Sequence, residues 1–177
     1  FRTRGNAPLN EPIIRKFQNI ECGDAVMDSD SVEPITDDAG NPVTRWDGRT
    51  TKPHPATGEE IPDETARVEA LRYVNPRRAK WPQADYIVGN PPYVGNKRMR
   101  LVLSEGYVDA LWLAYPDLPK TCDYVFYWWD RAAKCVASND ARRFGLITTK
   151  TITQPNNRQV VEPHLQSGLA IAFAVTN

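Results

Sequence analysis

The 177-residue chain is long enough for one domain with a substantial core, and its 41% hydrophobic and 25% charged residues are ordinary for a globular protein. Its 22 Lys and Arg residues balance 22 Asp and Glu residues, and a net charge of zero argues against a protein that coats nucleic acid nonspecifically. Three cysteines without a CxxC pair or a His cluster argue against a disulfide framework or a zinc site and fit a reducing, cytoplasmic compartment, and no apolar run approaches the roughly 20 residues of a membrane span.

The first half of the chain is poor in regular patterning. Apolar residues at helical spacing predict a helix over residues 8–20, and residues 20–26 are expected to be a strand end that runs into a loop. Residues 28–80 contain many turn-forming residues and few apolar ones. They are therefore predicted to form an inserted, loop-rich arm with short hairpins.

Strands and helices alternate in the second half. Short apolar runs predict buried strands at residues 84–89 and 143–149, and a third strand is expected to begin near Leu169. Helices are predicted near 98–115, at 123–138 with Asp123 as N-cap, and at 156–166. This alternation predicts the α/β class with a parallel sheet.

A tetrapeptide of Asn90, Pro91, Pro92 and Tyr93 directly follows the strand at 84–89. In open α/β sheets, ligands bind just beyond the carboxyl ends of the strands, so a site is expected here. Two successive prolines fix φ and remove two backbone donors, and Pro91 keeps Asn90 extended. The corner is therefore expected to be stiff and to present carbonyl oxygens without competing N–H groups.

The side chains of this corner suit one kind of ligand. Asn90 adds a side-chain carbonyl acceptor, and Tyr93 adds a flat face on which a ring can stack. Two acceptors held at one place match an amino group with two hydrogens to donate, such as adenine N6. Hydrogen bonds from both hydrogens favour a pyramidal nitrogen whose lone pair attacks a methyl sulfonium, so positioning and electrostatics would supply most of the rate.

The sequence DYIVGNPPY of Asp85–Tyr93 resembles motif IV of the class I S-adenosylmethionine-dependent DNA adenine-N6 methyltransferases, in particular the large type II restriction–modification and related phage-defence enzymes. The resemblance implies methyl transfer to the N6 of an adenine that is flipped out of double-stranded DNA. It assigns the target amino group to the Asn90 side chain and the Pro91 carbonyl. Pro92 would stiffen the loop, and Tyr93 would stack on the base.

Two further segments acquire roles beside this motif. The sequence ECGDAV of Glu21–Val26 resembles motif III of the family, which implies that Asp24 and Ala25 contact the S-adenosylmethionine cofactor. Three basic residues that follow the motif are interpreted either as phosphate contacts beside the flipped base or as a solvated helix start. These residues are Lys97, Arg98 and Arg100.

The resemblance also implies a fold and an extent. We expect a partial Rossmann-like class I methyltransferase sheet with helices on both faces, interrupted by residues 28–80 between the cofactor-side strand and the catalytic-motif strand. The family's Gly-rich cofactor loop is absent from the sequence and is expected before residue 1, and a target-recognition region is expected elsewhere. The isolated chain is therefore expected to be inactive.

Several residues have plainer interpretations, and rival functions stay open. The aromatic residues of 124–129 are interpreted as helix core rather than a stacking platform, and Phe173 as core rather than a wall of the base pocket. His54 and His164 are interpreted as structural. A protein glutamine-N5 or RNA methyltransferase, which shares the tetrapeptide, and a non-catalytic nucleic-acid-binding module are the alternatives, and the long arm with the basic run favours the DNA enzyme.

Overall fold

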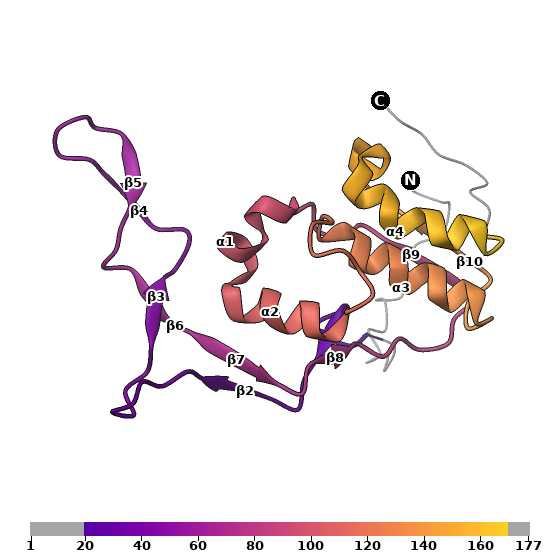
Figure 1. Cartoon of the computed structure of the whole chain (residues 1–177), viewed down its shortest axis with the longest axis horizontal. Helices are drawn as coiled ribbons and strands as arrows, with labels where there is room; N and C mark the ends of the chain where they lie inside the picture. Colours follow the sequence, from indigo (N-terminus) through magenta and orange to yellow (C-terminus); the bar gives the residue numbers. More distant parts are fainter. Residues whose placement is uncertain (1–19, 170–177) are drawn as a thin grey trace, which may run out of the picture.

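The computed structural model describes residues 20–169, which form a helical body and a long arm that projects from it (Figure 1). Helices and strands are mixed, in agreement with the predicted α/β class. The helix expected at 8–20, the strand expected to begin near Leu169 and the residue Phe173 fall wholly or largely outside the described residues. Within residues 20–169, no helix has the length and apolar character needed to cross a membrane.

Two parallel strands lie at the centre of the body. They are β9 (Tyr86–Gly89) and β10 (Arg143–Leu146), and their register pairs Phe144 with Ile87. Both predicted strands are confirmed in position, but neither is buried as expected, because each alternates exposed and half-buried residues. The predicted strand at 143–149 is shorter than expected, because the chain turns into the 3-10 helix η2 (Lys150–Thr153).

The two faces of this strand pair differ. On one face, Phe144 packs edge-on against Trp129 of α3 (Val125–Ala137), with ring centroids 5.5 Å apart. On the other face, Tyr86 and Val88 are 63% and 85% exposed. The expectation of helices on both faces is therefore not met within residues 20–169. Two strands offer too little area for a second helical layer to cover without further strands beside them.

The region predicted as one helix near 98–115 is in fact two helices. The 3-10 helix η1 (Asn96–Arg98) leads into α1 (Met99–Leu103), and α2 (Glu105–Ala114) follows. Ser104 separates α1 from α2 with a φ of 83°, and its hydroxyl oxygen accepts a hydrogen bond from the Tyr107 backbone N–H at 3.3 Å. A serine that caps the second helix therefore ends the first, which the hydrophobic spacing alone did not reveal.

The two later helices agree with the sequence in position. The predicted helix at 123–138 is α3, and the predicted helix at 156–166 is α4 (Pro155–Gln166), which buries Val160 and Val161. The predicted cap is wrong, because Tyr124 occupies the N-cap position without a side-chain hydrogen bond. The Asp123 side chain is bonded to other segments of the chain.

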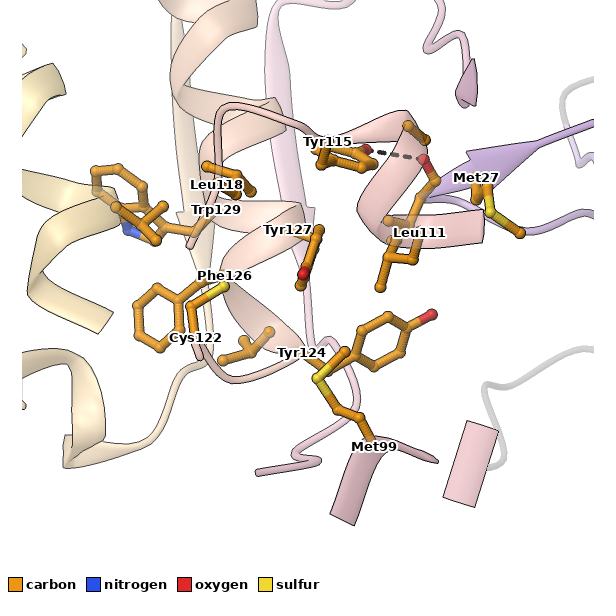
Figure 2. Close-up of a cluster of buried hydrophobic side chains, with 14 of the residues drawn as sticks. Met27, Met99, Leu111, Tyr115, Leu118, Cys122, Tyr124, Phe126, Tyr127 and Trp129 are labelled. Atoms are coloured by element: carbon orange, nitrogen blue, oxygen red, sulfur yellow. Dashed lines mark hydrogen bonds between the residues drawn. The ribbon is translucent and has the colours of Figure 1, made fainter. Parts of the chain in front are cut away.

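The core is built around the aromatic first turns of α3 (Figure 2). Tyr124, Phe126, Tyr127 and Trp129 are each at most 5% exposed, which confirms that these side chains are core. Tyr115 packs against Tyr127 with centroids 5.1 Å apart, and its hydroxyl donates to the Val26 carbonyl at 2.8 Å. Burial of each large side chain contributes roughly 1.5–3 kcal/mol, so the aromatic start of α3 is a main source of stability.

The arm is a two-stranded ribbon that contains short hairpins, as the sequence predicted, and is held together along its length by pairs that the sequence did not predict. Its strands pair antiparallel in a nested order, the first with the last and so on to the tip. The pairs are β1 (Met27–Asp28) with β8 (Arg77–Arg78), β2 (Ser31–Pro34) with β7 (Leu71–Val74), β3 (Thr44–Trp46) with β6 (Arg67–Glu69), and β4 (Thr51–Pro53) with β5 (Glu60–Pro62). The turn-forming residues between β2 and β3 form a short hairpin in which Thr36 bridges Pro42, and β4 and β5 form a second hairpin at the tip. Local turn signals therefore located the hairpins but not the long-range pairs between them.

The ribbon rests on the helices that follow the tetrapeptide. α2 crosses β7 so closely that a Cβ on Gly106 would overlap the carbonyl oxygen of Leu71. Nearer the tip, Gly48 has a φ of 76°, and a Cβ on it would lie 2.6 Å from the Leu101 carbonyl oxygen. Two glycines therefore permit the close approach of arm and body.

We predict that Gly106→Ala loosens the arm and lowers the free energy of unfolding by about 1–3 kcal/mol, since a methyl group there meets backbone that cannot move aside. Urea unfolding followed by circular dichroism measures the change. Gly145→Ala in β10 is the matched control, because an added Cβ meets no described atom within 4 Å. Equal stability of the two variants would contradict the close contact.

Candidate active site

The residues Asn90, Pro91 and Pro92 form a corner at the carboxyl end of β9. Pro91 is buried, whereas Asn90 and Pro92 are exposed. The strand fixes the corner from one side, because the Ile147 N–H of the β10 end donates to the Gly89 carbonyl at 3.0 Å. All peptide bonds of the described residues are trans, and the prolines fix φ at two successive positions. The corner is therefore rigid and partly open to solvent, as the sequence predicted.

The corner faces a hollow of about 300 Å³. Ten residues line it, namely Ala25, Trp81, Ile87, Val88, Gly89, Asn90, Pro91, Pro92, Trp128 and Leu146. The lining is mostly apolar, with few polar atoms at the corner itself. Such a combination is typical of a small-molecule site, in which apolar walls hold a ring and a few polar atoms orient it.

The two acceptors expected at the corner differ in whether they already accept a hydrogen bond from the described residues. Among residues 20–169, no hydrogen bond is made to the Pro91 carbonyl. The Oδ1 atom of Asn90 accepts a hydrogen bond from the Tyr93 hydroxyl. A ligand amino group that binds both acceptors must therefore displace this hydroxyl or use the second lone pair of Oδ1. Tyr93 is 49% exposed and is not among the residues that line the hollow.

The segment with Asp24 and Ala25 lies beside the corner. Ala25 lines the same hollow, and Asp24 holds the local turn through its Oδ1, which accepts hydrogen bonds from Val26 N–H at 2.7 Å and Met27 N–H at 3.1 Å. The Oδ2 of Asp24 accepts a hydrogen bond from the Tyr107 hydroxyl at 2.5 Å. Asp24 is exposed but is not among the residues that line the hollow.

Tyr107 is a residue that sequence reasoning missed. Its hydroxyl also meets that of Tyr124 at 2.6 Å. Burial first, and then Tyr124 and the Asp24 carboxylate, raise the pKa of Tyr107 above its ordinary value, so it stays a neutral donor to Asp24. Because it occurs in the sequence as one aromatic residue of an amphipathic helix, no sequence signal distinguished it from ordinary core.

Two tryptophans form the walls of the hollow. The indole N–H of Trp81 donates to the Ala25 carbonyl at 2.6 Å and ties the 24–25 segment to the chain just before β9. Trp128 lies in α3, with its ring 4.6 Å from that of Tyr124 in an edge-to-face arrangement. Trp128 was grouped with the core residues of α3, but it also lines the hollow. The sequence did not predict a role for Trp81, whose only distinguishing feature there is that it is an aromatic residue shortly before the strand.

The comparisons with known proteins decide the family. A model of the family described as "MmeI, DNA-methyltransferase domain" matches residues 14–177. This chain belongs to that family. Neither the curated proteins nor the solved structures include a match.

In this MmeI-type methyltransferase domain, the candidate phosphate contacts are not alike. Lys97 and Arg98 are exposed and make no ion pair within residues 20–169. Arg100 is paired with Asp109 at 2.6 Å, and its guanidinium lies 4.8 Å from the ring centre of Trp112. This arrangement favours a structural role for Arg100 and leaves the first two cations available to a partner.

A fourth cation of the methyltransferase domain lies close to these three. The Lys120 ammonium stands 4.9 Å from the ring centre of Trp112, the same ring that Arg100 contacts. The Asn96 side chain also donates to the Thr121 carbonyl at 2.7 Å, which brings the two loops together. Lys120 is 20 or more residues away from the basic run, so only the fold could reveal the proximity.

The histidines of the domain are engaged elsewhere. His54 Nδ1 accepts hydrogen bonds from Ala56 and Thr57 in the arm tip, both at 3.2 Å, and His164 Nε2 lies 2.8 Å from Asp130. Both act in local structure. Within residues 20–169, no three His, Cys, Asp or Glu side chains are grouped so as to hold a metal ion.

We predict that a maleimide labels Cys22 alone in the native domain. Cys22 is exposed next to the Asp24 segment, whereas Cys135 is 8% exposed, and burial raises the pKa of the fully buried Cys122 thiol to about 12. Mass spectrometry of peptides after a short reaction at pH 8 measures the labelling, and denatured protein with three labelled thiols is the control. Native labelling of Cys122 would contradict the packing at the start of α3.

Proposed function

We propose that this chain is the catalytic part of an S-adenosylmethionine-dependent enzyme that methylates adenine N6 in double-stranded DNA, as one component of a restriction–modification or related defence system. The family membership gives the DNA methyltransferase domain. The observation that supports the finer proposal is the rigid Asn90–Pro92 corner at the carboxyl end of β9, turned toward a hollow of about 300 Å³. Three free cysteines are compatible with a cytoplasmic location.

The corner would act by holding the target nitrogen. The Asn90 Oδ1 and the Pro91 carbonyl accept one hydrogen bond each from the amino group, which orients the nitrogen lone pair. A flipped adenine satisfies both acceptors, and a stacked adenine in the duplex cannot reach them. The proton on nitrogen becomes acidic once the nitrogen is methylated, so no strong base is needed. Fixed acceptors in a partly desolvated corner supply the rate through orientation and electrostatics.

The hollow fits a cofactor in size and position. A volume of about 300 Å³ lies at the lower end of small-molecule sites, and Ala25 and Trp128 give it apolar walls. S-adenosylmethionine, when bound, supplies an electrophilic methyl group. The Asp24 carboxylate, which Tyr107 holds in place, is proposed to contact the cofactor from the rim of the hollow.

DNA would approach over the helices that follow the corner. The proposed phosphate contacts are Lys97 and Arg98, and Lys120, which lies against the same Trp112 ring as Arg100, adds a positive charge nearby. The ribbon is the acidic part of the chain, since residues 27–78 contain 7 Lys and Arg against 11 Asp and Glu, whereas residues 20–26 and 79–169 together contain 11 against 10. An acidic arm is repelled by phosphates and is not proposed as a DNA clamp.

The fold proposal extends beyond the observed strand pair. A parallel pair joined by a helical crossover is the repeating unit of a doubly wound sheet, and we propose that β9, α3 and β10 belong to a Rossmann-like methyltransferase sheet. The sequence does not contain the Gly-rich cofactor loop of the family. We therefore propose that turnover requires a segment that carries such a loop, and that the isolated chain does not turn over.

We predict that the complete natural protein transfers labelled methyl from S-adenosylmethionine to adenine in DNA, and that Asn90→Ala lowers this rate about 10²–10³-fold, because one of two fixed acceptors is lost. Scintillation counting of DNA, followed by nucleoside analysis for N6-methyladenine, measures the transfer. Circular dichroism should be unchanged, since Asn90 is exposed.

The control for this experiment is Asn156→Ala, an exposed asparagine in the first turn of α4. Release-factor protein and RNA serve as competing acceptors for the rival methyltransferases. Methyl incorporation into either of these instead of DNA would refute the DNA enzyme, and full activity of Asn90→Ala would refute the corner as its site. DNA binding without any methyl transfer would support the non-catalytic module.

We further predict that Tyr93→Ala weakens the productive DNA complex by about 1–3 kcal/mol, the typical value of one aromatic–base stack. Tyr93→Phe should lose much less, because the ring is kept and Asn90 Oδ1 is freed from the tyrosine hydroxyl. Single-turnover methylation at varied DNA concentration measures both. If Phe were as damaging as Ala, the hydroxyl rather than the ring would be the functional group.

A further inference from the structure

The far side of the catalytic corner is held by one side chain from outside the hollow. Just after the corner, the Val94 carbonyl accepts a hydrogen bond from the Tyr124 N–H at 2.9 Å. Two residues later, the Asn96 N–H donates to Asp123 Oδ1 at 3.0 Å. The chain that leaves the corner is therefore tied to the start of α3 at two points.

Asp123 is itself fixed by a buried partner. The Asn157 side chain, 1% exposed, accepts a hydrogen bond from the Asp123 N–H and donates one to Asp123 Oδ2, both at 2.8 Å. The remaining amide hydrogen of Asn157 is donated to the Thr151 carbonyl at 3.0 Å, and the Thr151 hydroxyl donates to Asp123 Oδ2 at 2.9 Å. Every polar atom of the Asn157 amide is satisfied, and neither residue has rotational freedom in this arrangement.

The Asp123–Asn157 pair joins four segments at one point. They are the 94–96 loop after the corner, the start of α3, the turn at 150–153 after β10, and the first turn of α4. Neither Asp123 nor Asn157 lines the hollow. Their contacts therefore act on the corner through the backbone and not on a ligand.

We propose that Asp123 and Asn157 are positioning residues that set the geometry of the Asn90–Pro92 corner for methyl transfer. The proposal rests on the proposed function. β9 fixes the corner where it begins, and this pair fixes the chain where it leaves the corner. With both ends fixed, the two acceptors stay at one separation and orientation. Release of one end permits shifts of about 1 Å, and shifts of that size cost reaction rates about a hundredfold in enzymes.

The alternative role for the pair is simple helix docking, in which Asp123 and Asn157 hold α4 onto α3. Those two helices also share apolar and ionic contacts elsewhere, such as the His164–Asp130 hydrogen bond at 2.8 Å. Docking alone predicts that substitution lowers stability and leaves the rate per folded molecule unchanged. Positioning predicts a lower rate in molecules that remain folded.

The primary variant is Asp123→Asn in the complete natural protein. An amide has one acceptor oxygen, so it cannot serve both Asn96 and the Asn157 amide. We expect kcat for DNA methylation to fall about 10–100-fold, with KM for the cofactor within about threefold of the natural value, because the hollow keeps its lining. Asp140→Asn, an exposed substitution beyond the far end of α3, is the matched control and leaves kcat unchanged.

The reciprocal variant D123N/N157D tests the specific hydrogen bond. With donor and acceptor exchanged, the side chain at 123 donates to 157 and again accepts from Asn96. The Asp123 N–H also keeps an acceptor. The Thr151 carbonyl loses its donor, and the Thr151 hydroxyl, which donates to Asp123 Oδ2, has to accept from the new amide instead. Asp123→Asn lowers log kcat, and we expect the double variant to recover at least about a third of that decrease. A merely additive loss would overturn the positioning role of the pair.

Hydrogen exchange supplies a readout that does not depend on activity. In Asp123→Asn, we expect faster exchange in the peptide 93–98 and unchanged protection in residues 128–136 of α3. Unchanged exchange at 93–98, or equal loosening of all of α3, would overturn the inference. A protein with no methyl transfer but local loosening at 93–98 would refute the proposed function alone, so the two failures are distinguishable.

Discussion

The parallel pairing of β9 with β10 is the constraint on which the site depends. Parallel neighbours cannot be joined by a tight turn, so the chain must return across the sheet, and it does so through α3. That return begins at the carboxyl end of β9, where the corner lies. The chain that leaves the corner passes through α1 and α2 before α3, and the hydrogen bonds of Val94 and Asn96 hold the loop after the corner against the start of α3. Topology, more than any single contact, places rigid acceptors beside an aromatic helix.

The composition of α3 serves two purposes at once. Phe126, Tyr127 and Trp129 are buried, and Trp129 packs on Phe144 of β10 and on His164 of α4, while Trp128 in the same turns reaches the hollow. Because neighbouring residues on a helix point in different directions, four successive aromatic side chains supply both a core and one wall of the site. This double use explains how a short sheet can support the corner that is proposed to hold the target nitrogen. The corner is supported by the densest aromatic packing in the described part of the chain.

The sequence predicted those parts of the site that lie on one short segment. The stiffness of Pro91 and Pro92 is expected from their covalent geometry, and their predicted place at a strand end is observed. Contacts between residues that are far apart in the sequence could not be predicted in this way, because they do not follow from local covalent geometry. Trp81, Lys120 and Asn157 reach the site region only through folding, and nothing in their neighbours' identities signals it. The residue type and position of Asp123 predict a helix cap. Its carboxylate oxygens instead accept hydrogen bonds from the Asn96 backbone N–H and the Asn157 side chain, and not from the N–H groups at the start of α3. The ribbon was missed because nested pairing is a long-range property.

The arm shows how the charge of the chain is divided. Taken as a whole, the protein is neutral, which argues against a protein that binds DNA over its entire surface. The acidic excess lies in the ribbon, and the part that carries the corner is close to neutral. In the proposed complex, phosphates would be repelled from the ribbon and would meet the exposed Lys97 and Arg98 beside the corner, so that charge would help to orient the duplex. A neutral chain can thus present one face to DNA with the selectivity that a reaction at a single base requires.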